Sequence, residues 1–114
     1  MPAKKNPLNL NALQLRTLTL LQELARLPDY SRPHEEEAGS FVIGSLPLPH
    51  GDHFHLGEGV VSSQDATGLR NPAVWAALER KGLVRSLPNR VVLTALGVGY
   101  DTGLRDALVH RRTH

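Results

Sequence analysis

The 114-residue sequence contains no cysteine, a single methionine, a single tryptophan and few other aromatic residues. The absence of cysteine excludes disulfide bonds, thiolate zinc sites and a thiol nucleophile. No apolar run approaches the roughly 18 residues of a membrane span, and the first residues lack the apolar stretch of a secretory signal. Hydrophobic residues make up 40% of the chain and charged residues 21%. We therefore expect one soluble, cytoplasmic domain that does not contact a membrane.

The charges are distributed unevenly along the chain. Residues 29–58 hold six acidic side chains against one arginine, whereas residues 63–93 hold five basic side chains against two acidic ones. A polyanionic partner would therefore meet the second half of the chain. A solvated acidic loop and a solvated basic surface explain the same pattern equally well.

Apolar periodicity and chain-breaking residues divide the sequence into one domain with an extension at each end. Residues 1–9 are predicted to form a flexible tail, and residues 10–27 a leucine-rich helix that Pro28 ends. The remaining pattern predicts an acidic loop over 28–40, a β-hairpin over 41–61, two short helices over 62–82, a second hairpin over 83–93 and a C-terminal extension over 99–114.

The predicted N-terminal helix carries more leucine than a single apolar face needs. Most of its leucines fall on one arc of the helical wheel, but Leu15 and Leu18 lie off that arc. A second apolar strip needs a second partner. The pattern therefore predicts either a core that wraps around the helix or a homodimer interface built on Leu15 and Leu18.

Residues 62–98 follow the order short helix, turn, longer helix and two-stranded hairpin. The phrases Val-Trp-Ala-Ala-Leu-Glu-Arg-Lys-Gly-Leu-Val over 74–84 and Leu-Thr-Ala-Leu-Gly over 93–97 resemble the winged helix-turn-helix superfamily, and most nearly its MarR-type regulators. The resemblance implies an α+β winged helix-turn-helix with an N-terminal leucine-rich helix and an inserted β-hairpin. Two features differ from MarR-type regulators, namely the short wing turn Pro88-Asn89 and the β-rich segment 41–61.

A winged helix of this kind is expected to bind double-stranded DNA, as a small transcriptional regulator and not as an enzyme. The outer face of residues 72–81 offers few side chains that read base edges. Binding would therefore rest mainly on phosphate contacts, which position a protein without specifying a sequence. The candidate nucleic-acid-binding residues are Arg70, Asn71, Arg80, Lys81, Arg85 and Arg90.

Two alternatives stay open. Ala73 and Ala76 on the same outer face equally suit a protein partner, which would make the chain a dimerisation or adaptor module. The second alternative is a divalent transition metal, because imidazole and carboxylate groups at close spacing can coordinate one. Its candidate ligands are His50, His53 and His55, with Asp52 or Glu58 as a further or supporting ligand. A polar hairpin whose histidines bond to backbone carbonyls explains the same cluster. No other cofactor is predicted.

Overall fold

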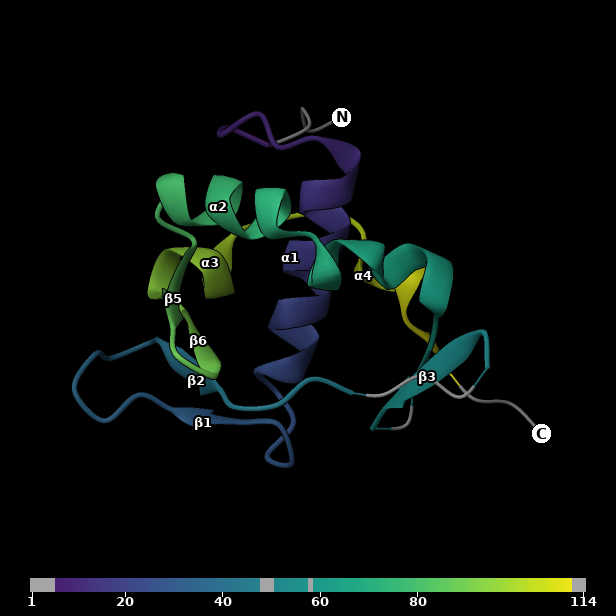
Figure 1. Cartoon of the computed structure of the whole chain (residues 1–114), viewed down its shortest axis with the longest axis horizontal. Coiled ribbons are helices and arrows are strands. Elements are labelled where there is room, and N and C mark those ends of the chain that lie inside the picture. Colours follow the sequence, from purple (N-terminus) through teal and green to yellow (C-terminus); the bar gives the residue numbers. More distant parts are fainter. Residues whose placement is uncertain (1–5, 48–50, 58, 112–114) are drawn as a thin grey trace.

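The computed structural model describes residues 6–47, 51–57 and 59–111, which form helices and two antiparallel sheets around a central helix (Figure 1). The protein is therefore α+β. In chain order the elements are α1 (Ala12–Leu24), β1 (Ser31–Pro33), β2 (Phe41–Ile43), β3 (His53–Leu56), β4 (Gly59–Ser62), the 3-10 helix η1 (Ser63–Arg70), α2 (Pro72–Arg80), β5 (Val84–Leu87), β6 (Arg90–Leu93), α3 (Ala95–Gly99), α4 (Arg105–Leu108) and β7 (His110–Arg111).

Helix α1 forms the centre of the molecule. It begins with a capping box, in which Asn11 Oδ1 accepts a hydrogen bond from the Gln14 N–H and Gln14 Oε1 accepts one from the Asn11 N–H. No helix in the described ranges is long and apolar enough to cross a membrane. The core of the protein consists above all of four leucines of this helix that are almost completely buried, Leu18, Leu20, Leu21 and Leu24.

The burial of Leu18 removes it from the homodimer interface predicted at Leu15 and Leu18, and homodimerisation itself stays a prediction. Leu18 is 0% exposed within the single chain, and Leu15 is half-buried against the same core. The second leucine strip has its partner inside the molecule, because η1, α2, α3 and α4 all pack against α1. The core wraps around the helix, which was the other explanation of the pattern.

The larger sheet has the strand order β1-β2-β6-β5, with every neighbouring pair antiparallel. The β5–β6 hairpin closes through Pro88 and Asn89, and Asn89 has a positive φ of 65° that asparagine tolerates better than most residues. Strand β2 pairs with β6, placing Val42 opposite Val92. The hairpin is therefore one half of a four-stranded sheet, in which β5 and β1 are the two edge strands.

The single hairpin predicted over residues 41–61 is wrong. Strand β2 joins the larger sheet, whereas β3 and β4 pair with each other in a second sheet of order β3-β4-β7. Figure 1 shows the two sheets on different sides of α1. Phe54, Leu56 and Val61 are buried beneath the second sheet and Ile43 beneath the first. Strand β1 lies within the segment that was predicted as an acidic loop.

Residues 6–9, predicted as part of a flexible tail, are attached to the domain by hydrogen bonds. Asn6 Oδ1 accepts hydrogen bonds from the Tyr100 hydroxyl at 2.7 Å and from the Leu10 N–H at 2.9 Å. The Leu8 N–H donates to the Tyr100 hydroxyl oxygen at 3.0 Å. The remaining tail residues, 1–5, lie outside the described part of the chain.

Glycine permits two close approaches in the core. A Cβ atom on Gly68 would overlap the Thr17 hydroxyl oxygen of α1, and one on Gly97 would overlap the Leu83 carbonyl oxygen and lie 2.7 Å from Leu93 Cδ1. Helices η1 and α3 therefore reach their positions only because these two residues lack a side chain.

A methyl group at Gly97 should destabilise the protein. Gly97→Ala is expected to lower the free energy of unfolding by about 1–3 kcal/mol, because the backbone at Leu83 must move to accommodate it. At Gly99, the last residue of α3, a Cβ meets nothing within 4 Å, so Gly99→Ala should leave stability unchanged or raise it by up to about 1 kcal/mol. Urea unfolding followed by Trp75 fluorescence measures both variants, and equal stabilities would contradict the close approach of α3 to Leu83.

Candidate functional site

A groove of about 750 Å³ opens between helix α2 and one end of the larger sheet. Helix α2 supplies one wall through Pro72, Trp75, Ala76 and Glu79. The other wall comes from residues 43–46 at the end of β2 and just after it, from residues 86, 87 and 89–91 of the β5–β6 hairpin, and from Arg70 at the end of η1.

The sequence around α2 explains which of its faces lines the groove. Asn71 Oδ1 accepts a hydrogen bond from the Ala73 N–H at 3.0 Å, and Pro72 occupies the first helical position, where a missing N–H costs nothing. The face of α2 that points away from the core carries small side chains, among them Ala76, which lines the groove. The buried face consists of Val74, Ala77 and Leu78, as the helical spacing predicts.

Most of the groove surface is apolar. Leu46 and Leu87 are 39% and 40% exposed, unusually high values for leucine in this chain. The indole N–H of Trp75 donates to the Leu69 carbonyl oxygen at 3.0 Å, which fixes the orientation of the ring in the wall. Val91 also lines the groove, although most of its side chain is buried. The groove therefore offers apolar side chains to solvent beside an aromatic ring held in one position.

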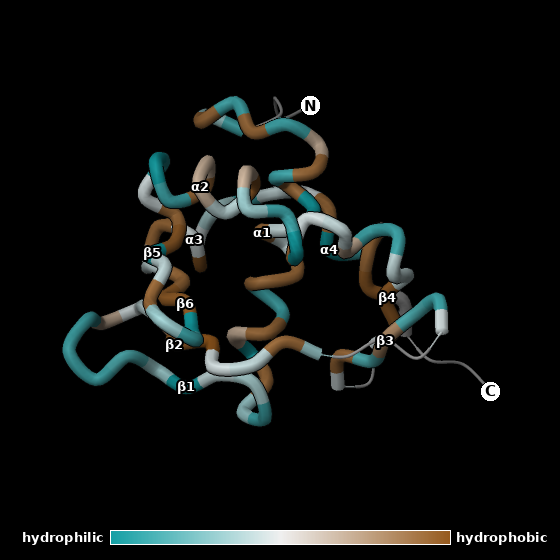
Figure 2. The backbone as a smooth tube through the Cα atoms, viewed as in Figure 1, coloured by the Kyte–Doolittle hydropathy of each residue, from teal (hydrophilic) through white to brown (hydrophobic). Residues whose placement is uncertain are grey.

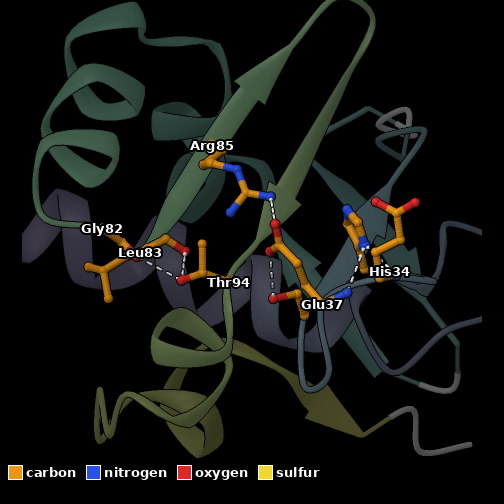
Figure 3. Close-up of polar contacts among 8 residues, drawn as sticks. His34, Glu37, Gly82, Leu83, Arg85 and Thr94 are labelled. Atoms are coloured by element: carbon orange, nitrogen blue, oxygen red, sulfur yellow. Dashed lines mark hydrogen bonds and ion pairs between the residues drawn. The ribbon is translucent and has the colours of Figure 1, made fainter.

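The side chain of Thr94 links the connection between α2 and β5 to α3. Its hydroxyl group donates to the carbonyl oxygens of Gly82 at 2.7 Å and Leu83 at 3.1 Å, both in the connection from α2 to β5 (Figure 3). Its oxygen also accepts a hydrogen bond from the Gly97 N–H at the start of α3. One side chain thus joins the α2–β5 connection, the residue after β6 and α3.

Charged side chains lie at the margin of the groove. Arg70 and Arg90 are both exposed, and neither forms an ion pair within the described ranges. The carboxylate of Glu79 accepts a hydrogen bond from the Ser86 N–H at 3.4 Å, which links α2 to β5. The margin therefore carries two cations that face solvent and one carboxylate that already has a partner.

A second hollow of about 480 Å³ adjoins the groove. Leu46 and Arg70 line both hollows, and the second is lined further by the apolar side chains of Phe54 and Leu69. An elongated occupant can therefore contact both hollows along the segment that includes Leu46.

Arg85, predicted to contact phosphate, binds a carboxylate of its own chain. Its Nη2 donates to Glu37 Oε2 at 2.5 Å (Figure 3). Glu37 lies in the hydrophilic β1–β2 loop (Figure 2), which His34 shapes by accepting the N–H groups of Glu36 and Glu37 at its Nδ1. The acidic loop is thus folded against the basic hairpin. The hydrogen bond from Arg85 lowers the pKa of the Glu37 carboxyl, although partial desolvation opposes that shift.

The other predicted nucleic-acid-binding residues have different surroundings. Lys81 Nζ donates to the Leu8 carbonyl oxygen at 2.9 Å, and the Asn71 side chain caps α2. Arg70, Arg80 and Arg90 are exposed. Three of the six candidate side chains are therefore engaged within the chain, and the three that remain lie at the end of η1, at the end of α2 and at the start of β6.

The histidine cluster is described only in part. His53 and His55 lie on β3 with their ring centroids 5.1 Å apart and their planes at 80°, and Asp52 Oδ1 is 3.3 Å from His53 Nδ1. His50 and Glu58 lie outside the described residues. Within the described ranges no group of three histidine or carboxylate side chains is arranged to hold a metal ion. The metal site stays a prediction.

Sequence reasoning missed the groove. Leu46 and Leu87 are each followed by proline, at positions 47 and 88, and each looks like the last residue of a separate strand. Only the pairing of β2 with β6 brings these two strand ends to the same side of α2. The available signal was a large apolar residue at a proline-marked chain break, where polar residues are usual.

Comparison of the chain with protein-family models, with curated proteins and with solved structures finds no match. The function is therefore argued from the groove and from the charges around it.

Removing Arg85 should raise the pKa of Glu37. In Arg85→Gln, carboxyl-detected NMR titration should show the Glu37 midpoint moving up toward the ordinary glutamate value. Because the folded-state pKa is lowered, the ion pair stabilises the fold above the unfolded-state pKa, and this contribution is lost as the pH falls through the folded-state pKa.

Arg80→Gln is the matched control, since Arg80 forms no ion pair among the described residues. Its Glu37 titration should be that of the unmodified chain. An unchanged Glu37 midpoint in Arg85→Gln would show that the acidic loop does not rest on the hairpin in solution.

Proposed function

We propose that this chain is a winged helix-turn-helix module that binds a partner protein through the groove between α2 and the β5–β6 hairpin. The winged-helix assignment is supported by the order of η1, α2, β5 and β6, which is short helix, longer helix and two-stranded hairpin. It is supported further by the packing of η1 and α2 against α1.

The observation that carries the proposal is the exposed apolar lining of the groove. Of the three exposed large apolar side chains in the described residues, Leu46, Leu87 and Leu96, the first two line the groove together with Trp75. Concave apolar surfaces with a few polar groups at the margin are typical of binding sites. An apolar side chain entering the groove gains about 25 cal/mol for each Å² removed from water.

The distribution of charge favours a protein over a phosphate backbone. Glu37 neutralises Arg85, and Lys81 is turned toward the Leu8 carbonyl oxygen. Glu79 adds a negative charge on the groove side of α2. With Arg85 and Lys81 engaged inside the chain, fewer cations are left for phosphates, and affinity for DNA depends on the number of phosphates that are neutralised.

Double-stranded DNA is the second candidate partner, and one observation favours it. Arg70, Arg80 and Arg90 are exposed and form no ion pair in the described ranges. Such a protein would be a transcription regulator that contacts mainly phosphates. With three available cations the logarithm of affinity should fall with the logarithm of salt concentration with a slope of about −3.

Filling the groove should abolish binding of the partner. Ala76 and Ala73 are both exposed on α2, but only Ala76 lines the groove. Peptides selected from a displayed random library on the unmodified chain should lose at least about tenfold in affinity for Ala76→Arg, because the new side chain occupies their place. They should bind Ala73→Arg unchanged, and their affinity should vary little with salt. Trp75, the only tryptophan, reports binding by its fluorescence.

The opposite pattern would identify DNA as the partner. If no peptide is enriched, and duplex DNA binds with a steep dependence on salt that Ala73→Arg and Ala76→Arg both strengthen, the protein-interaction proposal is wrong. Peptides that bind both variants equally would place the interaction elsewhere on the molecule.

A further inference from the structure

We infer that the segment that enters the groove is acidic as well as apolar, with a carboxylate beside its apolar anchor residues. The inference rests on the proposed function and adds the chemistry of the partner. It is argued from the charges at the margin of the groove, which are complementary to an acidic chain.

Arg70 supplies the first contact. It is exposed, it directly precedes the Asn71 cap of α2, and it lines both the groove and the adjoining hollow. A guanidinium group binds a carboxylate through two parallel hydrogen bonds, and it stays charged at any pH compatible with folding. A carboxylate on an extended chain that passes from one hollow to the other lies within reach of this arginine.

Arg90 supplies the second contact, from the opposite wall. It is the first residue of β6, and its backbone is fixed by pairing with Leu87 across the two-residue turn. Its side chain is exposed and has no ion pair within the described ranges. Leu87, the most exposed of the large apolar side chains that line the groove, is thus the cross-strand neighbour of a cation. A partner segment that has an apolar residue next to an acidic one is complementary to Leu87 and Arg90.

Arg85 on β5, in contrast, has an ion-pair partner within the chain. Glu37 reaches Arg85 from the β1–β2 loop and forms a hydrogen-bonded ion pair with it. No carboxylate of the described residues does the same for Arg70 or Arg90. The one carboxylate in the groove, Glu79, accepts a hydrogen bond from the Ser86 N–H. The margin therefore has a net positive charge toward an occupant.

An acidic peptide satisfies the groove more completely than a nucleic acid does. A phosphate backbone could contact both arginines, but it has no apolar side chain to cover Leu46 and Leu87. A peptide with an apolar core flanked by acidic residues can fill the apolar surface and contact the cations at the groove margin together.

Three capped peptides with the same leucine-phenylalanine core, flanked by glutamate, by glutamine or by lysine, test the inference. Binding is followed by Trp75 fluorescence, to which these peptides contribute no tryptophan signal. The glutamate peptide should bind about fivefold to tenfold more tightly than the glutamine peptide at low salt, and the lysine peptide most weakly.

The same titrations on variants assign the effect to the two arginines. Arg70→Gln with Arg90→Gln should remove the difference between the glutamate and glutamine peptides. Arg80→Gln removes an exposed arginine that does not line the groove, and it should keep the full difference. All three positions are exposed, and circular dichroism verifies that each variant is folded.

The failure of the inference and the failure of the proposed function give different results. Equal binding of the glutamate and glutamine peptides would overturn the acidic partner and leave the apolar groove standing. If none of the three peptides binds while duplex DNA quenches Trp75 fluorescence and loses this effect in the double arginine variant, both proposals are overturned. Preference for the lysine peptide would assign the recognition to Glu79 instead, and would also overturn the inference.

Discussion

The burial of helix α1 on nearly all sides is the constraint on which the rest of the structure depends. Its leucines form the centre of the core, and its buried threonines satisfy their hydroxyl groups locally, Thr17 on Leu13 and Thr19 on Leu15 and Thr102. Helices η1, α2, α3 and α4 all pack on this one helix. Helix α2 is positioned by its contact with α1, and its contact with β5 places it against the larger sheet beside the groove.

The groove exists because α2 presents a small side chain where the sheet presents large ones. Ala76 lines the helix wall and Leu87 the hairpin wall, while Thr94 links the α2–β5 connection to the residue after β6. The open groove leaves apolar surface exposed to water, which is unfavourable, and exposed apolar patches are typical of binding sites. The arginines near the groove are of two kinds. Arg85 is paired inside the chain, whereas the two arginines at the groove margin face solvent.

Local features were predictable from the sequence, and pairing between distant segments was not. The Asn71 cap, the buried face of α2 and the turn at Asn89 all depend on residues within a few positions of each other. The partner of β2 was assigned wrongly, because an apolar run of three residues does not encode which strand it will join. The Glu37–Arg85 pair and the groove depend on that pairing, and both were missed for this reason.

Amide chemical-shift mapping by NMR measures directly where a selected peptide binds. If the groove is the binding site, the largest perturbations should fall on residues 75, 76, 86 and 87, on both walls of the groove. The indole N–H of Trp75, which is held by the Leu69 carbonyl oxygen, should shift with them. Perturbations confined to α3 or to the β3–β4 hairpin, with the indole resonance unmoved, would contradict binding in the groove.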